Sequence, residues 1–251
     1  MIRLSTYASD LDALSADAAI AQLRRSAGGV TYLDGGWQSI VDGLEHAARD
    51  RGVVISSGNA VTQLEVTPNR VAVALGDNEV SGRAVVLAAG SPEVAARLLP
   101  AGSIPEDLGP SAQATCVDYG LSAPSTEPFI LGIDEPVYVS LHAPKAQLAP
   151  PGGAVLCAMA YGSAGKESAG RLDELAKMVG ADQPMILERR VLSSMTVAHA
   201  MPKPGSGLPG RPGISVPGTD NCFLAGDGEL GLLGDAAIAS GMAAGRAAAL
   251  R

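Results

Sequence analysis

The chain has 251 residues, of which 47% are hydrophobic and only 3% aromatic, and its formal net charge is −8. This length suits one large domain or two small ones with closely packed aliphatic cores. Lys and Arg occur at most in adjacent pairs such as Arg24-Arg25, and an acidic surface without basic clusters argues against nucleic acid as a partner.

No apolar run reaches the roughly 18 residues that span a membrane, and the first residues lack the apolar segment of a secretory signal peptide. We therefore expect no membrane span and a cytoplasmic protein.

The residue types that most often bind metals are few and scattered. The cysteines are Cys116, Cys157 and Cys222. Their odd number, wide spacing and apolar neighbours predict reduced core residues rather than a disulfide or a metal site. The histidines are His46, His142 and His199. None has a Cys or a carboxylate at the sequence spacing of metal ligands, so no metal is expected. His46 should lie on a helix surface, and His199 should be packed or solvated, with a place in a cavity wall as the alternative.

Two helices are predicted near the start of the chain. Residues 15–26 begin with Ser15, a residue type that caps helices, and carry Asp17 in the first turn, where the helix dipole favours negative charge. Residues 37–51 carry apolar side chains at helical spacing. Trp37 would be an apolar anchor at the start of this second helix.

Short apolar runs separated by turn residues then predict β-strands over 53–56, 60–66, 70–75 and 79–90. Residues 84–89 are apolar without alternation, as is typical of a parallel strand buried on both faces. Ser91, Pro92 and Glu93 would open another helix as its cap, first position and first turn.

The middle of the chain predicts a separate sheet. Four segments look like antiparallel strands joined by Pro and Gly turns: 114–122, 128–133, 136–143 and 153–162. A helix over 167–180 follows, and residues 188–202 lead into a proline-rich connector over 202–218. The connector contains Gly-Ser-Gly-Leu-Pro-Gly at 205–210, the spacing of a nucleotide-binding glycine loop. No strand precedes it, and its prolines oppose a helix start, so we interpret it as a connector.

The end of the chain holds a short apolar run, a Gly-Asp pair, a glycine-rich loop and a helix of small residues. Gly226 lets the backbone turn where a side chain would clash. Asp227 follows the carboxyl end of the predicted strand 222–225, the position at which open α/β sheets bind ligands. Its carboxylate could accept hydrogen bonds from hydroxyls of sugar type, and the helix beginning near Asp235 or Ala236 would offer free amides. Close packing with a turn is the alternative interpretation.

Small side chains should also form one stripe on this last helix and press against a sheet, a backbone or a flat ring. The residues expected in the stripe are Ala237, Ser240, Gly241, Ala244, Gly245 and Ala248.

This terminal element resembles the C-terminal flavin-binding motif of the FAD-dependent amine oxidase and phytoene desaturase type of flavoprotein. In that family a strand and the sequence Ala-Gly-Asp precede a loop and a helix rich in Ala, Ser and Gly. Other segments resemble the family in the same order: 31–66, 84–100, 189–202 and 210–218. The resemblance covers most of the chain, more weakly over 101–185.

The resemblance implies an α/β fold with two parts. One is an incomplete FAD-binding, Rossmann-like sheet formed by residues 29–100 and 213–251. The other is an inserted substrate-binding domain of mixed or antiparallel strands with helices, formed by residues 1–28 and 101–212.

The resemblance also implies roles for particular residues, with FAD as the cofactor. Asp227 would hold a ribityl hydroxyl, and Gly226 would permit the close approach of the ligand to the backbone. Amides of Ala236, Ala237 and Ile238 would face the flavin or the pyrophosphate. No catalytic residue is implied.

Further positions would approach the adenine or the substrate. Val61 would pair with adenine through its backbone, and Gly35 and Gly36 would lie where the chain passes the flavin or the substrate cavity. The sequence departs from the family after the Gly-Asp pair, where Gly228 replaces a bulky residue and the loop around Glu229 is altered.

The expected chemistry is hydride transfer from a C–N or C–C bond of a small-molecule substrate to the flavin. The family opens with a strand, a glycine turn and a helix that grip the FAD pyrophosphate, and the sequence does not contain them. A second chain that supplies this module is therefore one expected partner. The alternatives are a non-catalytic binding subunit of such a flavoprotein and a truncated fragment of one.

Overall fold

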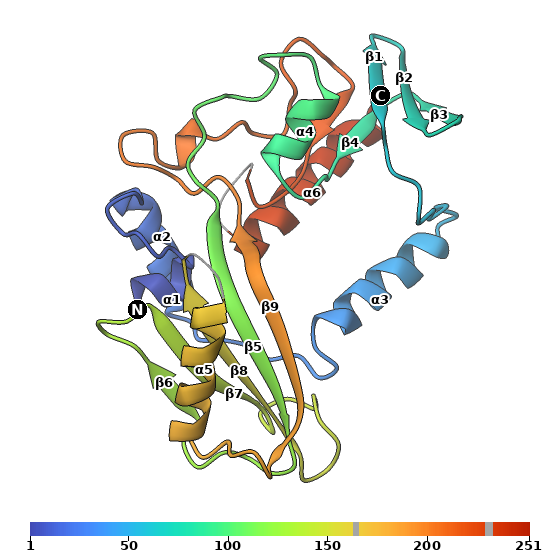
Figure 1. Cartoon of the computed structure of the whole chain (residues 1–251). Helices are drawn as coiled ribbons and strands as arrows, with labels where there is room; N and C mark the ends of the chain where they lie inside the picture. Colours follow the sequence, from blue (N-terminus) through green and yellow to red (C-terminus); the bar gives the residue numbers. More distant parts are fainter. Residues whose placement is uncertain (163–165, 229–232) are drawn as a thin grey trace.

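The computed structural model describes residues 1–162, 166–228 and 233–251 (Figure 1). Its largest layer is a five-stranded sheet in the order β6-β7-β8-β5-β9. The strands are β5 (Ala112–Leu121), β6 (Phe129–Leu131), β7 (Val137–Ala143), β8 (Ala154–Tyr161) and β9 (Ile186–Ala198). All neighbouring pairs are antiparallel, which confirms the four predicted strands and adds β9 at one edge.

Successive side chains of this sheet point to opposite faces, as the pleat requires. The helix α5 (Lys166–Met178) covers one face, where Val117, Tyr119 and Leu156 pack against its Leu172. The alternate residues of the same strands form the other face. Side chains from α1 (Ile2–Thr6) and from the segment 28–36 lie against that face.

The first two helices pack together at one end of the large sheet. α2 (Ala16–Ser26) confirms the predicted helix, and its buried Ala18 and Ala19 join Ala112 and Ala198 in one apolar cluster. The Ser15 hydroxyl bonds to the Asp17 carboxylate rather than to a helix amide. α1 is only five residues long, too short for its periodicity to be read from the sequence.

A second, smaller layer is a parallel pair of strands, β4 (Val85–Leu87) and β10 (Cys222–Leu224). The helix α4 (Pro92–Leu98) packs on the face that carries Leu87 and Leu224. The helix α6 (Leu233–Ala249) packs on the face that carries Phe223. The Ser91 hydroxyl accepts a hydrogen bond from the amide of Val94 at 3.2 Å, which confirms the predicted cap of α4.

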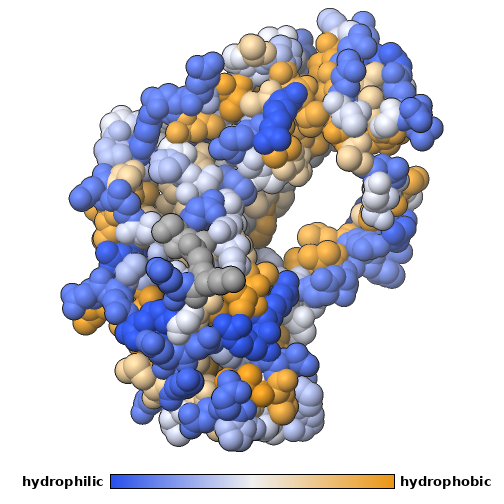
Figure 2. All heavy atoms as spheres, in the orientation of Figure 1, coloured by the Kyte–Doolittle hydropathy of each residue, from blue (hydrophilic) through white to orange (hydrophobic). Residues whose placement is uncertain are grey.

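A third group of elements extends away from the body. The helix α3 (Trp37–Arg49) stands apart from both sheets in Figure 1, and Figure 2 shows open space between it and the rest of the molecule. No residue of α3 is buried, and Leu44 on its apolar side is 66% exposed. Beyond it lies a small antiparallel sheet of β1 (Gln63–Thr67), β2 (Arg70–Leu75) and β3 (Asn78–Gly82).

One strand prediction in this region is wrong, and two others have different bounds in the structure. Residues 53–56 form no strand, and the strand expected over 60–66 begins only at Gln63. Val54 is 90% exposed although it is apolar. A strand needs a neighbour with which to exchange hydrogen bonds, and within the described residues none lies beside 53–56. The run expected over 79–90 is likewise divided into β3 and β4.

The proline-rich connector behaves as predicted. Its glycine-spaced segment contains one turn of 3₁₀-helix, η1 (Leu208–Gly210), and no strand immediately precedes it, since β9 ends at Ala198. A nucleotide-binding glycine turn needs a strand directly before it and an α-helix directly after it, and the connector has neither.

Candidate functional site: a Gly-Asp strand end beside an aromatic cavity

The Gly226-Asp227 pair lies directly after the carboxyl end of β10, beside the parallel strand β4. Ser240 of α6 fixes the turn, because its hydroxyl accepts a hydrogen bond from the Gly226 amide at 2.9 Å and lies 2.9 Å from the Gly226 carbonyl oxygen. Ser240 is fully buried. The helix therefore holds both backbone polar groups of Gly226 in place.

His199, just after β9, holds the Asp227 carboxylate. Its backbone amide donates to one carboxylate oxygen at 3.0 Å, and its ring Nδ1 lies 2.9 Å from the other. Arg211 donates to the Asp227 carbonyl oxygen at 3.0 Å. His199 is partly buried and is not among the residues that line the cavity, as expected, but its pairing with Asp227 was not predicted. The two residues are far apart in the chain and meet only where both sheets end.

The substitution of a bulky residue by Gly228 has a steric reason. A Cβ atom at this position would lie 3.1 Å from the Pro92 ring at the start of α4. Glu229, in the altered part of the loop, lies outside the described residues.

The buried stripe of α6 is narrower than expected. Ala236, Ser240 and Ala244 are buried, and all three lie on one side of the helix. Gly241 and Gly245 have open space where a side chain would project, so their expected close packing is wrong. Ala237 and Ile238 are exposed as well, because only the i, i+4, i+8 positions of the helix face β10.

The remaining predicted positions lie apart from Asp227. Gly35 and Gly36 have φ angles of 75° and 70°, which favour glycine. Gly36 precedes α3 and lines a cavity on the large sheet. Val61 is 41% exposed and faces the apolar edge of β4, where Val86 and Ala88 line a shallow hollow.

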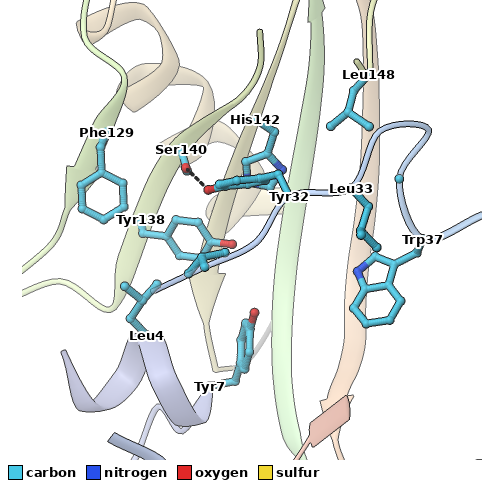
Figure 3. A pocket seen from close by; sticks show the side chains of 12 residues that line it. Leu4, Tyr7, Tyr32, Leu33, Trp37, Phe129, Tyr138, Ser140, His142 and Leu148 are labelled. Carbon is cyan, nitrogen blue, oxygen red and sulfur yellow. Dashed lines mark hydrogen bonds between the residues drawn. The ribbon is translucent and has the colours of Figure 1, made fainter. Parts of the chain in front are cut away.

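The cavity that includes Gly36 lies on the face of the large sheet opposite α5, and it has a volume of about 340 Å³ (Figure 3). The chain has eight aromatic residues, counting five Tyr, two Phe and one Trp. Five of them line this cavity: Tyr7, Tyr32, Trp37, Phe129 and Tyr138. None of the described residues that line it is charged. The aromatic side chains of an aromatic-poor protein are thus gathered around one hollow.

Two polar side chains, Ser140 and His142, also line the cavity. The Tyr32 hydroxyl lies 3.3 Å from the Ser140 hydroxyl, the contact dashed in Figure 3, and the Tyr32 ring lies against the His142 imidazole with ring centres 4.9 Å apart. Burial raises the pKa of Tyr7 and Tyr138, with a smaller contribution from their neighbours. Both phenols therefore keep their hydrogens at neutral pH.

The cavity lies beside the N-terminal end of α6, the helix that follows the Gly-Asp pair in the chain. The Trp37 ring at the rim of the cavity comes within 3.8 Å of the Cβ position of Gly234, in the first turn of α6. Tyr7 packs in the same apolar cluster as Leu233. A ligand in the cavity would therefore lie close to whatever binds at the N-terminal end of α6.

The residues around Asp227 fit the polyol chain of FAD. An ionised carboxylate has about four acceptor positions, and His199 uses two of them. The Asp227 side chain is 18% exposed, so hydroxyl groups can reach the remaining positions. Among the described residues, the strand, glycine turn and helix formed by β10, Gly226 to Gly228 and α6 already surround Asp227, and the turn between β4 and α4 carries only one glycine, Gly90. The fit therefore covers the ribityl end of the cofactor.

Sequence reasoning placed Ser240 on the stripe of α6 without its hydrogen bonds to Gly226, and of the cavity residues it assigned only Gly36 to a substrate cavity. The signal that could have found the cavity is the scarcity of aromatic residues, because a chain with so few of them places each at a position that needs a flat apolar surface. The free state predicted for the three cysteines is confirmed. Burial raises the pKa of Cys222 to about 11, which keeps this core thiol protonated.

Comparison of folds finds solved structures with a similar architecture. It is similar to the cyclohexylamine oxidase of Brevibacterium oxydans, with a TM-score of 0.56, 16% identity, and coverage of 76% of this chain and 48% of that one. A putative protoporphyrinogen oxidase of Exiguobacterium has a TM-score of 0.54 and 17% identity, with coverage of 86% of this chain and 51% of that one. A protein of Pyrococcus furiosus has a TM-score of 0.59 and 15% identity, with coverage of 86% of this chain and 53% of that one. The chain thus spans about half the length of each of these proteins, and at such identities the likeness concerns the fold.

No curated protein matches the sequence. Within the described ranges, no helix combines the length and the apolar character needed to cross a membrane. The model of one protein family, described as FAD dependent oxidoreductase, matches residues 3–249. The match covers nearly the whole chain, and the chain therefore belongs to this family of FAD-dependent oxidoreductases.

Proposed function

We propose that the protein is part of an oxidoreductase of the amine oxidase and phytoene desaturase type, which oxidises a C–N or C–C bond of a small molecule. The observation that carries this proposal is the position of Asp227, at a strand end beside an uncharged aromatic cavity in a chain of an FAD-dependent family. FAD, when bound, supplies the acceptor for the hydride that leaves the substrate.

The proposal divides the chain between cofactor and substrate. Residues 29–100 and 213–251 would belong to the FAD-binding domain, and residues 1–28 and 101–212 to the substrate domain. The three free cysteines fit a reducing compartment such as the cytoplasm.

Within the first part, Asp227 would accept hydrogen bonds from a ribityl hydroxyl while His199 keeps its carboxylate in position. Gly226 would allow the close approach. Because α6 begins at Leu233, free amides would be offered to the flavin or the pyrophosphate by its first turn, which ends at Ala236, rather than by Ala237 and Ile238. Val61 would meet the adenine, and Gly35 and Gly36 would pass beside the substrate.

Within the second part, the cavity would hold the substrate and exclude water from the bond that reacts. Tyr7, Tyr138 and Phe129 supply flat apolar surface. The Trp37 ring at the rim lies 3.8 Å from the Cβ position of Gly234, in the first turn of α6. The substrate would therefore be held between the aromatic wall and the flavin.

The pyrophosphate and adenosine would need a dinucleotide-binding module, supplied by a second chain or by a further segment. Exposed apolar surface supports this part of the proposal. β4 pairs with β10 on one side only, Val54 is 90% exposed and Leu44 is 66% exposed. The helix α3, which carries Leu44, borders the open space of Figure 2, and added strands there could pair with β4 and cover α3.

The same exposed surfaces favour a second candidate function, a non-catalytic subunit that completes a partner flavoprotein. The test is the visible absorbance spectrum of the purified chain, alone and together with a module of strand, glycine turn and helix. The proposed enzyme should carry little flavin alone and show flavin bands in a defined stoichiometry with the module. A colourless complex would overturn the enzyme proposal in favour of the non-catalytic subunit.

A further inference from the structure

Three polar side chains form a line across the cavity face of the large sheet, one from each of three neighbouring strands. Asp118 on β5 lies opposite Cys157 on β8, and the Cys157 sulfur lies 3.3 Å from Nδ1 of His142 on β7. Because Asp118 and Cys157 are directly opposite each other in the register and an ionised carboxylate can only accept, the Cys157 thiol is the donor in the interaction between them. The three residues are far apart in sequence, and only the strand order β7-β8-β5 brings them together.

The contacts among Asp118, Cys157 and His142 determine the positions of the thiol hydrogen of Cys157 and the ring hydrogen of His142. Burial, reinforced by the charge and the hydrogen bond of Asp118, raises the pKa of Cys157 well above its usual range, so the sulfur keeps its hydrogen and donates it to Asp118. The sulfur can then act toward His142 only as an acceptor, which assigns the ring hydrogen of His142 to Nδ1. In the neutral ring, Nε2 is left with an acceptor lone pair.

The neutral form of His142 is favoured by its surroundings. Burial lowers the pKa of His142, the nearby charge of Asp118 opposes that effect, and the charge of Lys145 adds to it. The Lys145 ammonium lies 5.6 Å from the centre of the Tyr32 ring. In the part of the chain that the structure describes, Nε2 has no hydrogen-bond partner, although His142 lines the cavity.

We propose that the cavity binds an uncharged, flat and largely apolar molecule that carries a hydroxyl group, and that this hydroxyl donates its hydrogen to Nε2 of His142. The aromatic wall supplies the surface for the flat part of the ligand, and the absence of charged side chains among the described lining residues disfavours carboxylates and other ions. Asp118 and Cys157 act through His142 as positioning residues. The inference rests on the proposed function, since it names the substrate class of that cavity, but it can be tested without flavin.

The test is isothermal titration of the full chain with naphthol and with its methyl ether, which has the same rings but cannot donate a hydrogen bond. At neutral pH, naphthol should bind about five- to tenfold more tightly than the ether, as expected for one net hydrogen bond. His142→Phe should abolish this preference while retaining affinity for the ether. Cys157→Ser, which can still donate and accept, should keep the preference. His46→Phe, on the exposed surface of α3, is the control and should bind both probes like the wild type.

The pH dependence separates this role from a structural one. Below the lowered pKa of His142, Nε2 becomes a donor, so the preference for naphthol should disappear in acid although the ether still binds. The groups that face His142 are Asp118, Cys157, Lys145 and Tyr32.

Equal affinity of the wild type for the two probes would overturn the inference, as would a preference for naphthol that persists in His142→Phe. No binding of either probe by the folded chain would overturn it as well. None of these results bears on flavin binding at Asp227, so failure of the proposed function would be seen separately, in the flavin titrations.

Discussion

His199 binds both oxygens of the Asp227 carboxylate, one through its backbone amide at 3.0 Å and one through its ring at 2.9 Å. The contact joins the end of β9, in the large sheet, to the loop after β10, in the parallel pair. It also limits the rotation of a carboxylate that we expect to face the ribityl chain of FAD. Preorganisation of this kind reduces the entropy lost on binding.

We predict that His199→Ala weakens flavin binding about three- to tenfold. The backbone amide of residue 199 would remain, but the carboxylate would lose its second anchor and would have to be ordered by the ligand. Titration of riboflavin and FAD, followed by quenching of flavin fluorescence, measures the effect. His46→Ala is the matched control on the surface of α3. Unchanged affinity in His199→Ala would show that the pair does not preorganise the site.

We predict that Ser240→Ala destabilises the protein by about 1–3 kcal/mol, because it leaves the partly buried Gly226 amide without its hydrogen-bond partner. Chemical denaturation followed by circular dichroism gives the free energy of unfolding. A variant as stable as the wild type would mean that water or another group satisfies that amide.

We predict that Gly241→Ala, one residue further along α6, is neutral or stabilises the protein by up to about 1 kcal/mol. The position is exposed and has open space, and alanine costs less conformational entropy than glycine in a helix. Thermal melting beside Ser240→Ala makes the comparison. A lower melting temperature of Gly241→Ala would show that Gly241 is closely packed, as the wider stripe expected from the sequence requires.

The pH dependence of stability should show the contribution of Asp173. Burial by itself would raise the pKa of this carboxyl, but hydrogen bonds from Arg189 and Tyr119 outweigh burial and lower it. Because the pKa is lower in the folded state, the stabilisation is present above about pH 4, the unfolded value, and is lost as the pH falls through the folded value.

We therefore predict that Asp173→Asn lowers the free energy of unfolding at neutral pH by about 1 kcal/mol, a modest value because the carboxylate is partly solvated. The difference from the wild type should shrink as the pH falls below about 4. Glu135→Gln, which disrupts the exposed pair with Arg171, is the control and should have a smaller effect. A difference that does not depend on pH would contradict the role of the Asp173 charge.

The sequence predicted those parts of the fold whose signals are local. The alternation of the four strands in the middle of the chain and the Ser91 cap were sufficient for β5 to β8 and for α4. The strand predicted over residues 53–56 is absent because a strand needs a neighbouring strand, and an apolar run in the sequence does not show whether that neighbour is present.

The candidate site was predictable only in part for a similar reason. The Gly226-Asp227 pair is a contiguous motif, and the resemblance marked it. His142, Cys157 and Asp118 lie on separate strands, so their contacts depend on the strand order and register of the large sheet. The pairing of His199 with Asp227 likewise requires the two sheets to meet.

The central claim is that Asp227 binds the flavin cofactor, and the most direct measurement compares the affinity of the wild type and of Asp227→Ala for FAD by fluorescence quenching. Asp77→Ala, in the exposed turn between β2 and β3, is the matched control. A hydrogen bond to a charged group contributes about 1.5–3 kcal/mol, so Asp227→Ala should bind FAD at least about tenfold more weakly, while Asp77→Ala binds like the wild type. Equal affinity of the folded wild type and Asp227→Ala, or no saturable binding by the wild type at millimolar flavin, would contradict the claim.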